Sequence, residues 1–291
     1  MRSWLAPLGR LAITLLLVAA ALLVAVWLWH RYERDPWTRD GHIRADVVRV
    51  TPDVSGLVTQ VAVRDNQRVK PGDLLFVVDR PRFALALAQA DAAIASARAT
   101  LNQARRESAR DLALGDLVAA ETHEQNVARA ATAAAALAQA QTSRDQAVLN
   151  LQRTTVRATV NGTVTNLDLH PGDYVAAGQQ ALALVDDDSI RVEGYFEETK
   201  LPRIRIGDPV RVQLMGDAAP IRGHVDSISA GISDSERTNA GNLLPTVNPT
   251  FAWVRLAQRI PVRVKLDQVP AGTRLIAGRT ATVTILPQAG R

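Results

Sequence analysis

The sequence contains no cysteine, few aromatic residues and almost no lysine. Its 291 residues are 4% Phe, Trp and Tyr, and the only lysines are Lys70, Lys200 and Lys265. Without thiols the chain has no disulfide, no thiolate metal ligand and no cysteine nucleophile. Arginine therefore carries nearly all of the positive charge, and the formal net charge is +5.

The basic composition does not follow the pattern of a nucleic-acid-binding protein. A sequence pI near 10.2 is compatible with a nucleic acid or an anionic membrane as partner. The arginines, however, are scattered among Asp and Glu, with no basic block and no interleaved aromatics. We therefore expect no nucleic-acid partner.

Motifs for catalysis, cofactors and metals are also missing. The sequence has no G-x-S-x-G, no phosphate-binding loop and no G-x-G-x-x-G. Its five histidines are isolated from one another, and no two have metal-ligand spacing. Three consecutive aspartates at 186–188 could ligate a metal, but a solvated turn explains them better. We predict a protein that is not an enzyme, with no catalytic, cofactor-binding or metal-binding residues.

One long hydrophobic run occupies residues 11–29, where Thr14 is the only polar side chain. At helical rise this run covers about 28 Å, close to the hydrocarbon thickness of a bilayer. A cleaved signal peptide is the alternative, because residues 19–21 are all alanine. Cleavage there would leave an apolar tail, so we predict an uncleaved transmembrane anchor over residues 11–29. Arginines on both sides leave its orientation open.

An internal repeat organises the middle of the chain. Residues 47–79 align with a second stretch when shifted by 106 positions, so that Gly56 matches Gly162 and Gly72 matches Gly178. The matched apolar residues alternate as in half-buried strands, and the glycines mark turns. Neither half has enough apolar surface for a stable sheet alone, so we expect the two halves to close on each other as a small sandwich.

The insert between the two halves has a helical pattern. Its first arm repeats apolar residues at alternating spacings of four and three, as in a coiled-coil seam: Phe83, Leu87, Ala90, Ile94, Ala97, Leu101 and Ala104. The returning arm does so at Val127, Ala130, Ala134, Leu137, Val148 and Leu151, with interruptions at Gln141 and Arg144. Pro81 suits a helix start, and Gly115 lies near the midpoint. We predict an antiparallel helical hairpin over residues 81–153.

The C-terminal third has short alternating segments separated by Gly and Pro. This pattern predicts a small antiparallel β-barrel over residues 188–287. Residues 231–249 are long and polar, and we expect a loop there.

The split repeat resembles the two halves of a biotinyl/lipoyl carrier domain, and the insert resembles the helical hairpin of HlyD-like membrane fusion proteins (periplasmic adaptors). Carriers have a modifiable lysine in the turn joining their halves, which here would follow Val78. No lysine is present there, so we expect no attached biotin or lipoate. Residues 248–266, NPTFAWVRLAQRIPVRVKL, resemble the barrel of the p-hydroxybenzoic acid efflux and EmrA-like adaptors.

The fold class expected is therefore mainly β with a long α-helical hairpin. A transmembrane helix is followed by lipoyl-like halves at 42–79 and 155–187, with the hairpin inserted between them, and then by the barrel. The resemblance implies an N-terminus (residues 1–10) in the cytoplasm, an anchor in the inner membrane and the bulk of the protein in the periplasm.

The resemblance also implies a function. It indicates an adaptor of a tripartite efflux pump for aromatic carboxylic acids or drugs, which assembles as a homo-oligomeric ring. Such an adaptor links an inner-membrane transporter to a TolC-like outer-membrane channel. Two alternatives stay open: an adaptor of a type I protein secretion system, and a membrane-anchored coiled-coil scaffold without a transport role.

Many adaptors of this family that dock on a TolC-like channel carry Arg-x3-Leu-x6-Ser at the hairpin tip. Arg110 and Leu114 match the start of this pattern, and Glu121 occupies the serine position. The resemblance thus implies a channel-docking tip at Arg110, Leu114 and Glu121. The alternative is that the hairpin is only a rigid spacer.

Overall fold

The computed structural model describes residues 5–29, 36–114, 119–232, 237–239, 245–247, 257–270 and 272–286. The chain forms two compact units. One consists of Met1–Ala45 with Ser189–Arg291, and the other is Asp46–Asp188. Each unit is described by itself below.

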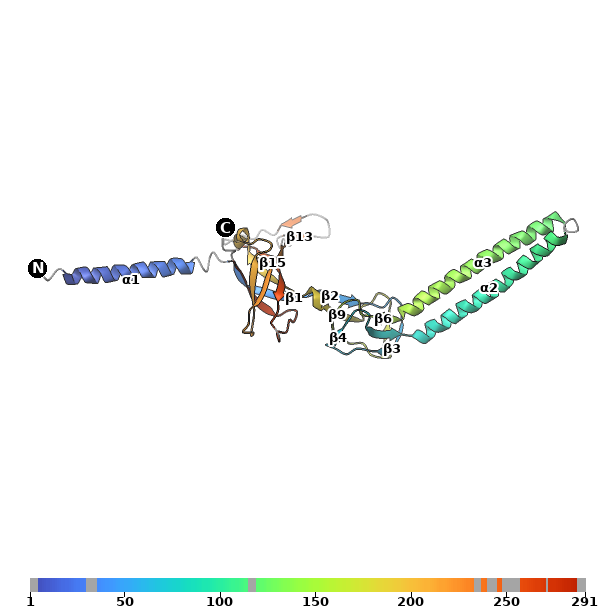
Figure 1. Cartoon of the computed structure of the whole chain (residues 1–291), viewed down its shortest axis with the longest axis horizontal. Coiled ribbons are helices and arrows are strands. Elements are labelled where there is room, and N and C mark those ends of the chain that lie inside the picture. Colours follow the sequence, from blue (N-terminus) through green and yellow to red (C-terminus); the bar gives the residue numbers. More distant parts are fainter. Residues whose placement is uncertain are drawn as a thin grey trace. The chain divides into compact units, whose positions relative to one another are not determined.

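The hydrophobic run at the N-terminus lies within helix α1, Leu5–Trp29 (Figure 1). Among the residues described above, no helix is both long and apolar enough to cross a membrane. The anchor predicted for residues 11–29 is therefore not confirmed by the structure.

The two halves of the repeat form two four-stranded sheets. The first half supplies β2 (Val47–Val50), β3 (Gly56–Val61), β4 (Arg68–Val69) and β5 (Leu74–Val78). The second half supplies β6 (Thr155–Arg157), β7 (Gly162–Thr165), β8 (Tyr174–Val175) and β9 (Leu182–Asp186). The strand orders are β2-β9-β7-β4 and β6-β5-β3-β8, so each sheet contains strands from both halves.

Backbone hydrogen bonds between the two halves repeat with the same shift of 106 positions that relates the two halves in the sequence. The backbone N–H of Asn66 donates to Val164 O at 3.0 Å, and the N–H of Gly172 donates to Val58 O at 2.8 Å. Residues 66 and 172 differ by 106, as do residues 58 and 164. Each half therefore binds the other through the same contacts, which explains why neither half needs to be stable alone.

A single hydrophobic core lies between the two sheets. Its largest fully buried side chains come from both halves, namely Phe76, Leu75, Leu182, Leu184, Val58, Val78 and Val164. Burial of these apolar side chains is the main source of the sandwich's stability.

The acidic run at 186–188 is a turn that ends the sandwich. It spans the end of β9 and the 3-10 helix η3, Asp187–Ser189. The N–H of Asp188 donates to Asp186 Oδ1 at 2.9 Å, and an Asp187 carboxylate oxygen lies 3.7 Å from Arg68 Nε.

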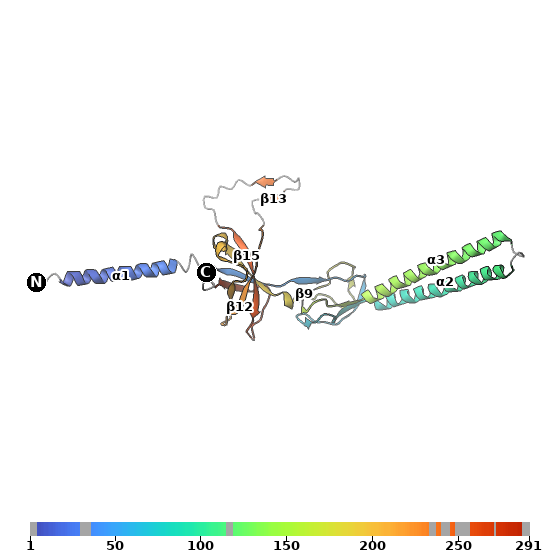
Figure 2. The ribbon, with the colours of Figure 1, turned by 45° about the horizontal axis from the view of Figure 1, so that its top comes forward.

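The unit made of Met1–Ala45 and Ser189–Arg291 contains a closed six-stranded barrel (Figure 2). Its strands in order around the barrel are β1 (Trp37–Arg44), β10 (Arg191–Glu197), β15 (Arg259–Gln268), β12 (Ile221–Ile228), β11 (Pro209–Leu214) and β16 (Thr280–Ile285). The 3-10 helix η4, Glu198–Arg203, follows β10, and β13 (Arg237–Asn239) pairs with β14 (Pro245–Val247).

Strand β1 corrects one predicted boundary. The sequence pattern predicts that residues 42–45 belong to the first lipoyl-like half, whereas β1 pairs with β10 and β16 and closes the barrel. Ile43 is fully buried in the barrel core. At Gly41 a side-chain Cβ would lie 2.6 Å from Ala281 O, so glycine permits this close strand approach. Alternation alone shows that these residues form a strand, but not which sheet the strand joins.

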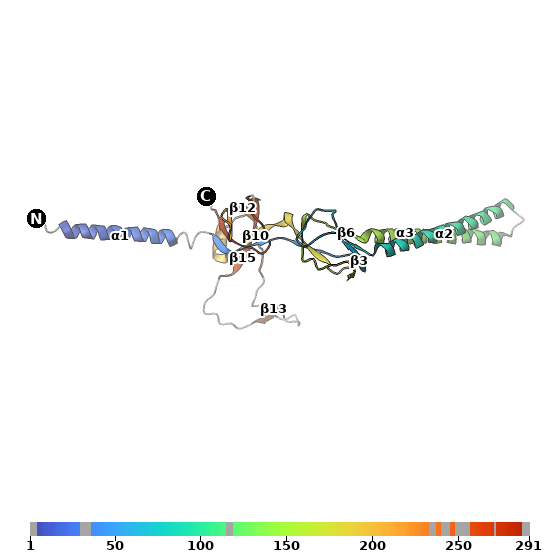
Figure 3. The same ribbon diagram turned by 90° about the horizontal axis from the view of Figure 1, so that it is seen from below.

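The helical hairpin leaves the sandwich between β5 and β6. Helix α2 is Arg80–Leu114 and helix α3 is Ala120–Arg153. The two helices run side by side in Figures 1 and 3. At the root, Val78 N–H donates to Thr154 O at 2.8 Å, and Arg153 forms an ion pair with Asp53 at 3.4 Å. The 35 residues of α2 give the hairpin a length of about 50 Å.

Candidate docking site

Alanine is the most frequent residue on the facing surfaces of α2 and α3. The less exposed residues of α2 between 83 and 104 are those of the predicted seam, and Leu101 and Ala104 are buried. On α3, Ala130, Ala134 and Leu137 pack in the same cluster, and Ala133 is its buried member. Alanine buries little area, so the hairpin gains only modest stability from this contact.

The assignment of Val127 to the seam of α3 is wrong. Val127 is 47% exposed, whereas its neighbour Asn126 is half-buried and faces α2. The Asn126 side-chain amide donates to Asp111 Oδ2 at 2.5 Å. This hydrogen bond joins the two helices, so Asn126 and not Val127 lies on the facing side of α3.

The predicted interruption of the seam at Arg144 has a structural explanation. Arg144 Nε donates to Asp91 Oδ1 of α2 at 2.9 Å. Both side chains are about half exposed, so this pair contributes at most about 1 kcal/mol to stability. It connects α3 to α2 about three turns from the root of the hairpin.

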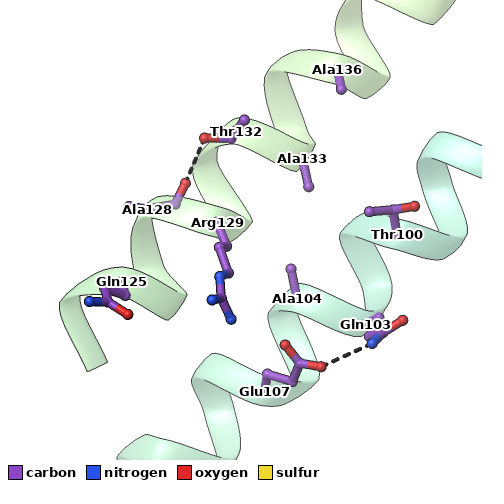
Figure 4. A pocket seen from close by; sticks show the side chains of 10 residues that line it. All are labelled: Thr100, Gln103, Ala104, Glu107, Gln125, Ala128, Arg129, Thr132, Ala133 and Ala136. Atoms are coloured by element: carbon purple, nitrogen blue, oxygen red, sulfur yellow. Dashed lines mark hydrogen bonds between the residues drawn. The ribbon is translucent and has the colours of Figure 1, made fainter. Parts of the chain in front are cut away.

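A shallow groove of about 680 Å³ follows the alanine contact (Figure 4). Ala104 and Ala133 face each other across it, and the Arg129 side chain extends from α3 toward α2. Gln103 donates to Glu107 at 3.0 Å along the edge of α2. The groove therefore has a small-residue floor with charged residues at its distal end.

The contact between the helices becomes polar toward the tip. Asn126 of α3 donates to Asp111 of α2, and within α3 Arg129 Nη1 donates to Asn126 Oδ1 at 3.2 Å. His123 Nδ1 is buried and accepts or donates no hydrogen bond among the residues that the structure describes. At this end the hydrogen bond from Asn126 to Asp111 joins the two helices.

The three candidate docking residues all lie at the distal end of the hairpin. Leu114 is the last residue of α2, 45% exposed, and Arg110 is exposed one turn before it. Glu121 lies in the first turn of α3, where a carboxylate is favourable to the helix dipole, and its Oε1 accepts from Gln125 at 3.4 Å. Arg110 has no ion pair with another described residue. The structure thus brings a cation, an apolar side chain and an anion to one exposed end.

Several predicted features fall outside the described residues. These are Gly115 in the connection between α2 and α3, most of the polar loop at 231–249, and the Trp253 and Arg255 part of the barrel motif. The following part, from Gln258 to Arg263, is described and contributes to β15.

The comparisons with known proteins agree with this architecture. Residues 46–187 match the barrel-sandwich hybrid domain of RND membrane fusion proteins (MFP). Residues 189–286 match the AAEA-like beta-barrel domain. The chain belongs to the membrane fusion protein family of periplasmic adaptors. Adaptors of this family are not enzymes, and they typically oligomerise and work with an inner-membrane transporter and an outer-membrane channel.

This adaptor is similar in sequence to the uncharacterized protein YdhJ of Escherichia coli (strain K12). The two are 41% identical over 273 residues, which cover 94% of this chain and 96% of YdhJ. The fold is similar to that of the membrane fusion protein Spr0693 from Streptococcus pneumoniae R6, with a TM-score of 0.65 and 19% identity over 86% of this chain and 98% of the other. MacA from Actinobacillus actinomycetemcomitans has a TM-score of 0.60 and 20% identity, over 87% and 79% of the two chains.

Proposed function

We propose that this adaptor is the periplasmic subunit of a tripartite efflux pump, linking an inner-membrane transporter to a TolC-like outer-membrane channel. Residues 11–29 anchor it in the inner membrane, with residues 1–10 in the cytoplasm and the rest in the periplasm. Copies associate as a ring. The adaptor performs no chemical step: it couples the two membrane proteins and keeps the exported solute within one conduit.

The observation that carries this proposal is the attachment of the hairpin. Strands β5 and β6 are hydrogen-bonded neighbours, with Val77 opposite Thr155, so both helices leave the sandwich from one place. The ion pair between Arg153 and Asp53 and the hydrogen bond from Arg82 to Ser55 O at 2.9 Å fasten both helices to the same segment of the sandwich. A hairpin of about 50 Å with a fastened root suits an adaptor that must reach a distant partner.

The proposed cargo is an aromatic carboxylic acid or a drug. Its support is the match of the barrel to the AAEA-like domain, together with the likeness of residues 248–266 to the barrels of p-hydroxybenzoic acid and EmrA-like efflux adaptors.

The tip residues Arg110, Leu114 and Glu121 are proposed to dock on the outer-membrane channel. Leu114 supplies apolar area that is still exposed, and the two charged side chains offer a donor and an acceptor to a channel loop. Glu121 replaces the usual serine, so we expect its acceptor to pair with a cationic or N–H group of the channel.

Cross-linking from the tip tests the proposal directly. Because the chain has no cysteine, Thr122→Cys creates a unique attachment point for a photo-activated cross-linker on an exposed residue beside Glu121, and the three proposed docking residues stay unchanged. We expect an outer-membrane channel to be captured and a multi-spanning transporter to co-purify, and deletion of the gene to raise sensitivity to the exported compound. Recovery of neither protein, together with unchanged sensitivity, would instead favour a scaffold without a transport role.

A further inference from the structure

One end of the barrel receives the chain from the hydrophobic helix α1. Strand β1 begins at Trp37, eight positions after α1 ends at Trp29. A chain segment of that length spans at most about 28 Å, whatever its conformation. The start of β1 is therefore held close to residues 11–29, which are proposed above as the membrane anchor. We call the end of the barrel where β1 starts the anchor-side end.

Strand pairing shows what else lies at the anchor-side end. Trp37 lies opposite Thr284 near the end of β16, and the start of β11 pairs with the end of β16, with Val210 opposite Ile285. Strand β10 runs antiparallel to β1 and therefore finishes at this end too. The segment 198–208, which joins β10 to β11, consequently lies here as well.

The segment 198–208 covers this end of the barrel. Strands β10 and β11 are three places apart in the ring of six, in either direction, so the segment joins opposite sides of the barrel. Two of its side chains, Leu201 and Ile204, pack on the barrel core, and Ile204 is only 5% exposed. The neighbouring Arg203 and Arg205 are exposed. The segment thus has an apolar inner side and a basic outer side.

The outer side also has one strongly exposed apolar residue, Ile206, at 69%. Its turn is tightly held, because the Arg205 N–H donates to Asp208 Oδ2 at 2.8 Å and the Gly207 N–H donates to Val225 O at 2.8 Å. Gly207 has a φ of 89°, which favours glycine. Single exposed apolar residues are common, so exposure alone does not define a binding surface. The residues that accompany the isoleucine indicate its partner.

Cations and an aromatic ring accompany the isoleucine at this end. Arg203 and Arg205 precede it in the sequence by three positions and by one. Lys200 Nζ lies 5.8 Å from the centroid of the Trp37 ring, and the Arg39 guanidinium lies 5.4 Å from the same centroid. An exposed aliphatic side chain, a tryptophan and several cations are the residue types that meet lipid headgroups at a membrane surface.

Most carboxylates described at this end are already bound within the barrel. Ion pairs or a backbone hydrogen bond hold three of them: Glu197 with Lys200, Asp40 with Arg259, and Asp208 with the Arg205 N–H. A fourth, Glu198, is exposed at the start of η4. The Arg205 guanidinium has no ion pair with another described residue, so it is available to a phosphate oxygen.

We propose that the anchor-side end of the barrel docks on the anionic phospholipid surface of the membrane that holds the anchor. Ile206 enters the headgroup layer, Arg203 and Arg205 bind lipid phosphates, and Trp37 lies at the interface. The short tether makes this contact effectively intramolecular, so a weak surface affinity is sufficient. The proposal rests on the proposed anchor, and it adds a second contact that orients the barrel on the membrane.

Quenching of a fluorescent label by headgroup-spin-labelled lipid tests the contact. The full chain is reconstituted through its anchor into vesicles with or without phosphatidylglycerol. The label is attached at Thr199→Cys, an exposed position of η4 in a chain without cysteine. A label at Ala277→Cys is the control, because this exposed residue lies in the turn before β16, at the opposite end of the barrel. We expect strong quenching at position 199 with phosphatidylglycerol, less at high salt or in neutral vesicles, and none at position 277.

Two substitutions separate the effect of charge from that of apolar insertion, each with a matched change at the opposite end. In the Thr199→Cys protein, Arg205→Gln should lower the ratio of docked to undocked barrel about fivefold. Ile206→Ser should lower this ratio about tenfold. Arg274→Gln and Ile276→Ser should leave the ratio unchanged, since both residues are exposed in the segment before β16.

Failure of the anchor and failure of the docking give different results. If residues 11–29 do not anchor the chain, it will not float with vesicles at high salt, and the docking falls with the anchor. A chain that floats while its label at position 199 is as unquenched as the label at position 277 keeps the anchor and overturns the docking. Equal quenching in neutral vesicles, or an equal effect of Ile276→Ser and Ile206→Ser, would also overturn it. Quenching that requires a co-reconstituted transporter would assign this end of the barrel to a protein contact instead.

Discussion

Replacing Leu114 by aspartate distinguishes a docking tip from a spacer. Leu114 ends α2 and is 45% exposed, so the change removes little buried area from the folded adaptor. A carboxylate at a helix C-terminus is unfavourable, by about 0.3–1 kcal/mol. The tip also lies about 50 Å along the hairpin from the sandwich, so the stability of that domain should not change.

The same substitution should be severe if Leu114 is buried against a channel. Losing the burial of its remaining exposed area would cost about 1 kcal/mol. Bringing a carboxylate without a partner into a desolvated contact would cost several kcal/mol more. A total of about 4 kcal/mol weakens association by roughly a thousandfold, which turns a micromolar contact into a millimolar one. We therefore expect export to be lost.

The assay is resistance to an exported compound in a deletion strain carrying each variant, with adaptor abundance measured in parallel. Leu85→Asp is the control, because Leu85 lies on the same helix, is 61% exposed and is distant from the tip. Arg110→Ala should reduce export less than Leu114→Asp. Full resistance in the Leu114→Asp strain at normal abundance would refute docking through this residue, and loss of export in the Leu85→Asp control would show that the assay reports general damage.

Three other outcomes follow from the sequence and the fold. Intact mass of membrane-extracted adaptor should retain residues 1–29, and loss of residues 1–21 would show a cleaved signal peptide instead. The same spectrum should show no biotin or lipoate increment on any of the three lysines, because none lies between β5 and α2. Val58→Ala and Val164→Ala should each lower the free energy of unfolding by about 2 kcal/mol in one cooperative transition, since both side chains are buried in the shared core. Separate unfolding of the two halves, followed by denaturant titration, would contradict the interleaved fold.

Much of this fold could be predicted because its signals are local or repeated. The alignment of residues 58 and 164 came from sequence alone, and the backbone hydrogen bonds follow the same shift. The seam of α2 can be predicted because its apolar residues follow one another at spacings of four and three throughout. In α3 the same reasoning predicts Val127 in the seam, because an apolar residue is favoured there over Asn126. In the structure Asn126 faces α2 and donates to Asp111.

What could not be predicted depends on pairing between distant segments. Strand β1 precedes β10 by about 150 residues, and nothing in its alternation indicates that it belongs to the barrel. The surface at the anchor-side end of the barrel has the same origin, since Trp37 and Ile206 lie at one end only when β1, β16 and β11 become neighbours. In the linear sequence these two residues are far apart and follow no shared pattern.

The repeat symmetry also explains how the sandwich accommodates so long an insertion. The hairpin leaves between Val78 and Thr154, whose backbones are hydrogen-bonded at 2.8 Å. A shift of Val78 by +106 gives Leu184, and a shift of Thr154 by −106 gives Val48. Leu184 and Val48 lie opposite each other in the pairing of β9 with β2. The chain enters the sandwich at β2 and leaves it at β9. Both connections thus occur at paired strand ends rather than through the core. An insertion at such a site breaks no ladder hydrogen bond and exposes no core residue, so the hairpin can lengthen or change its surface while the sandwich that holds its root stays the same.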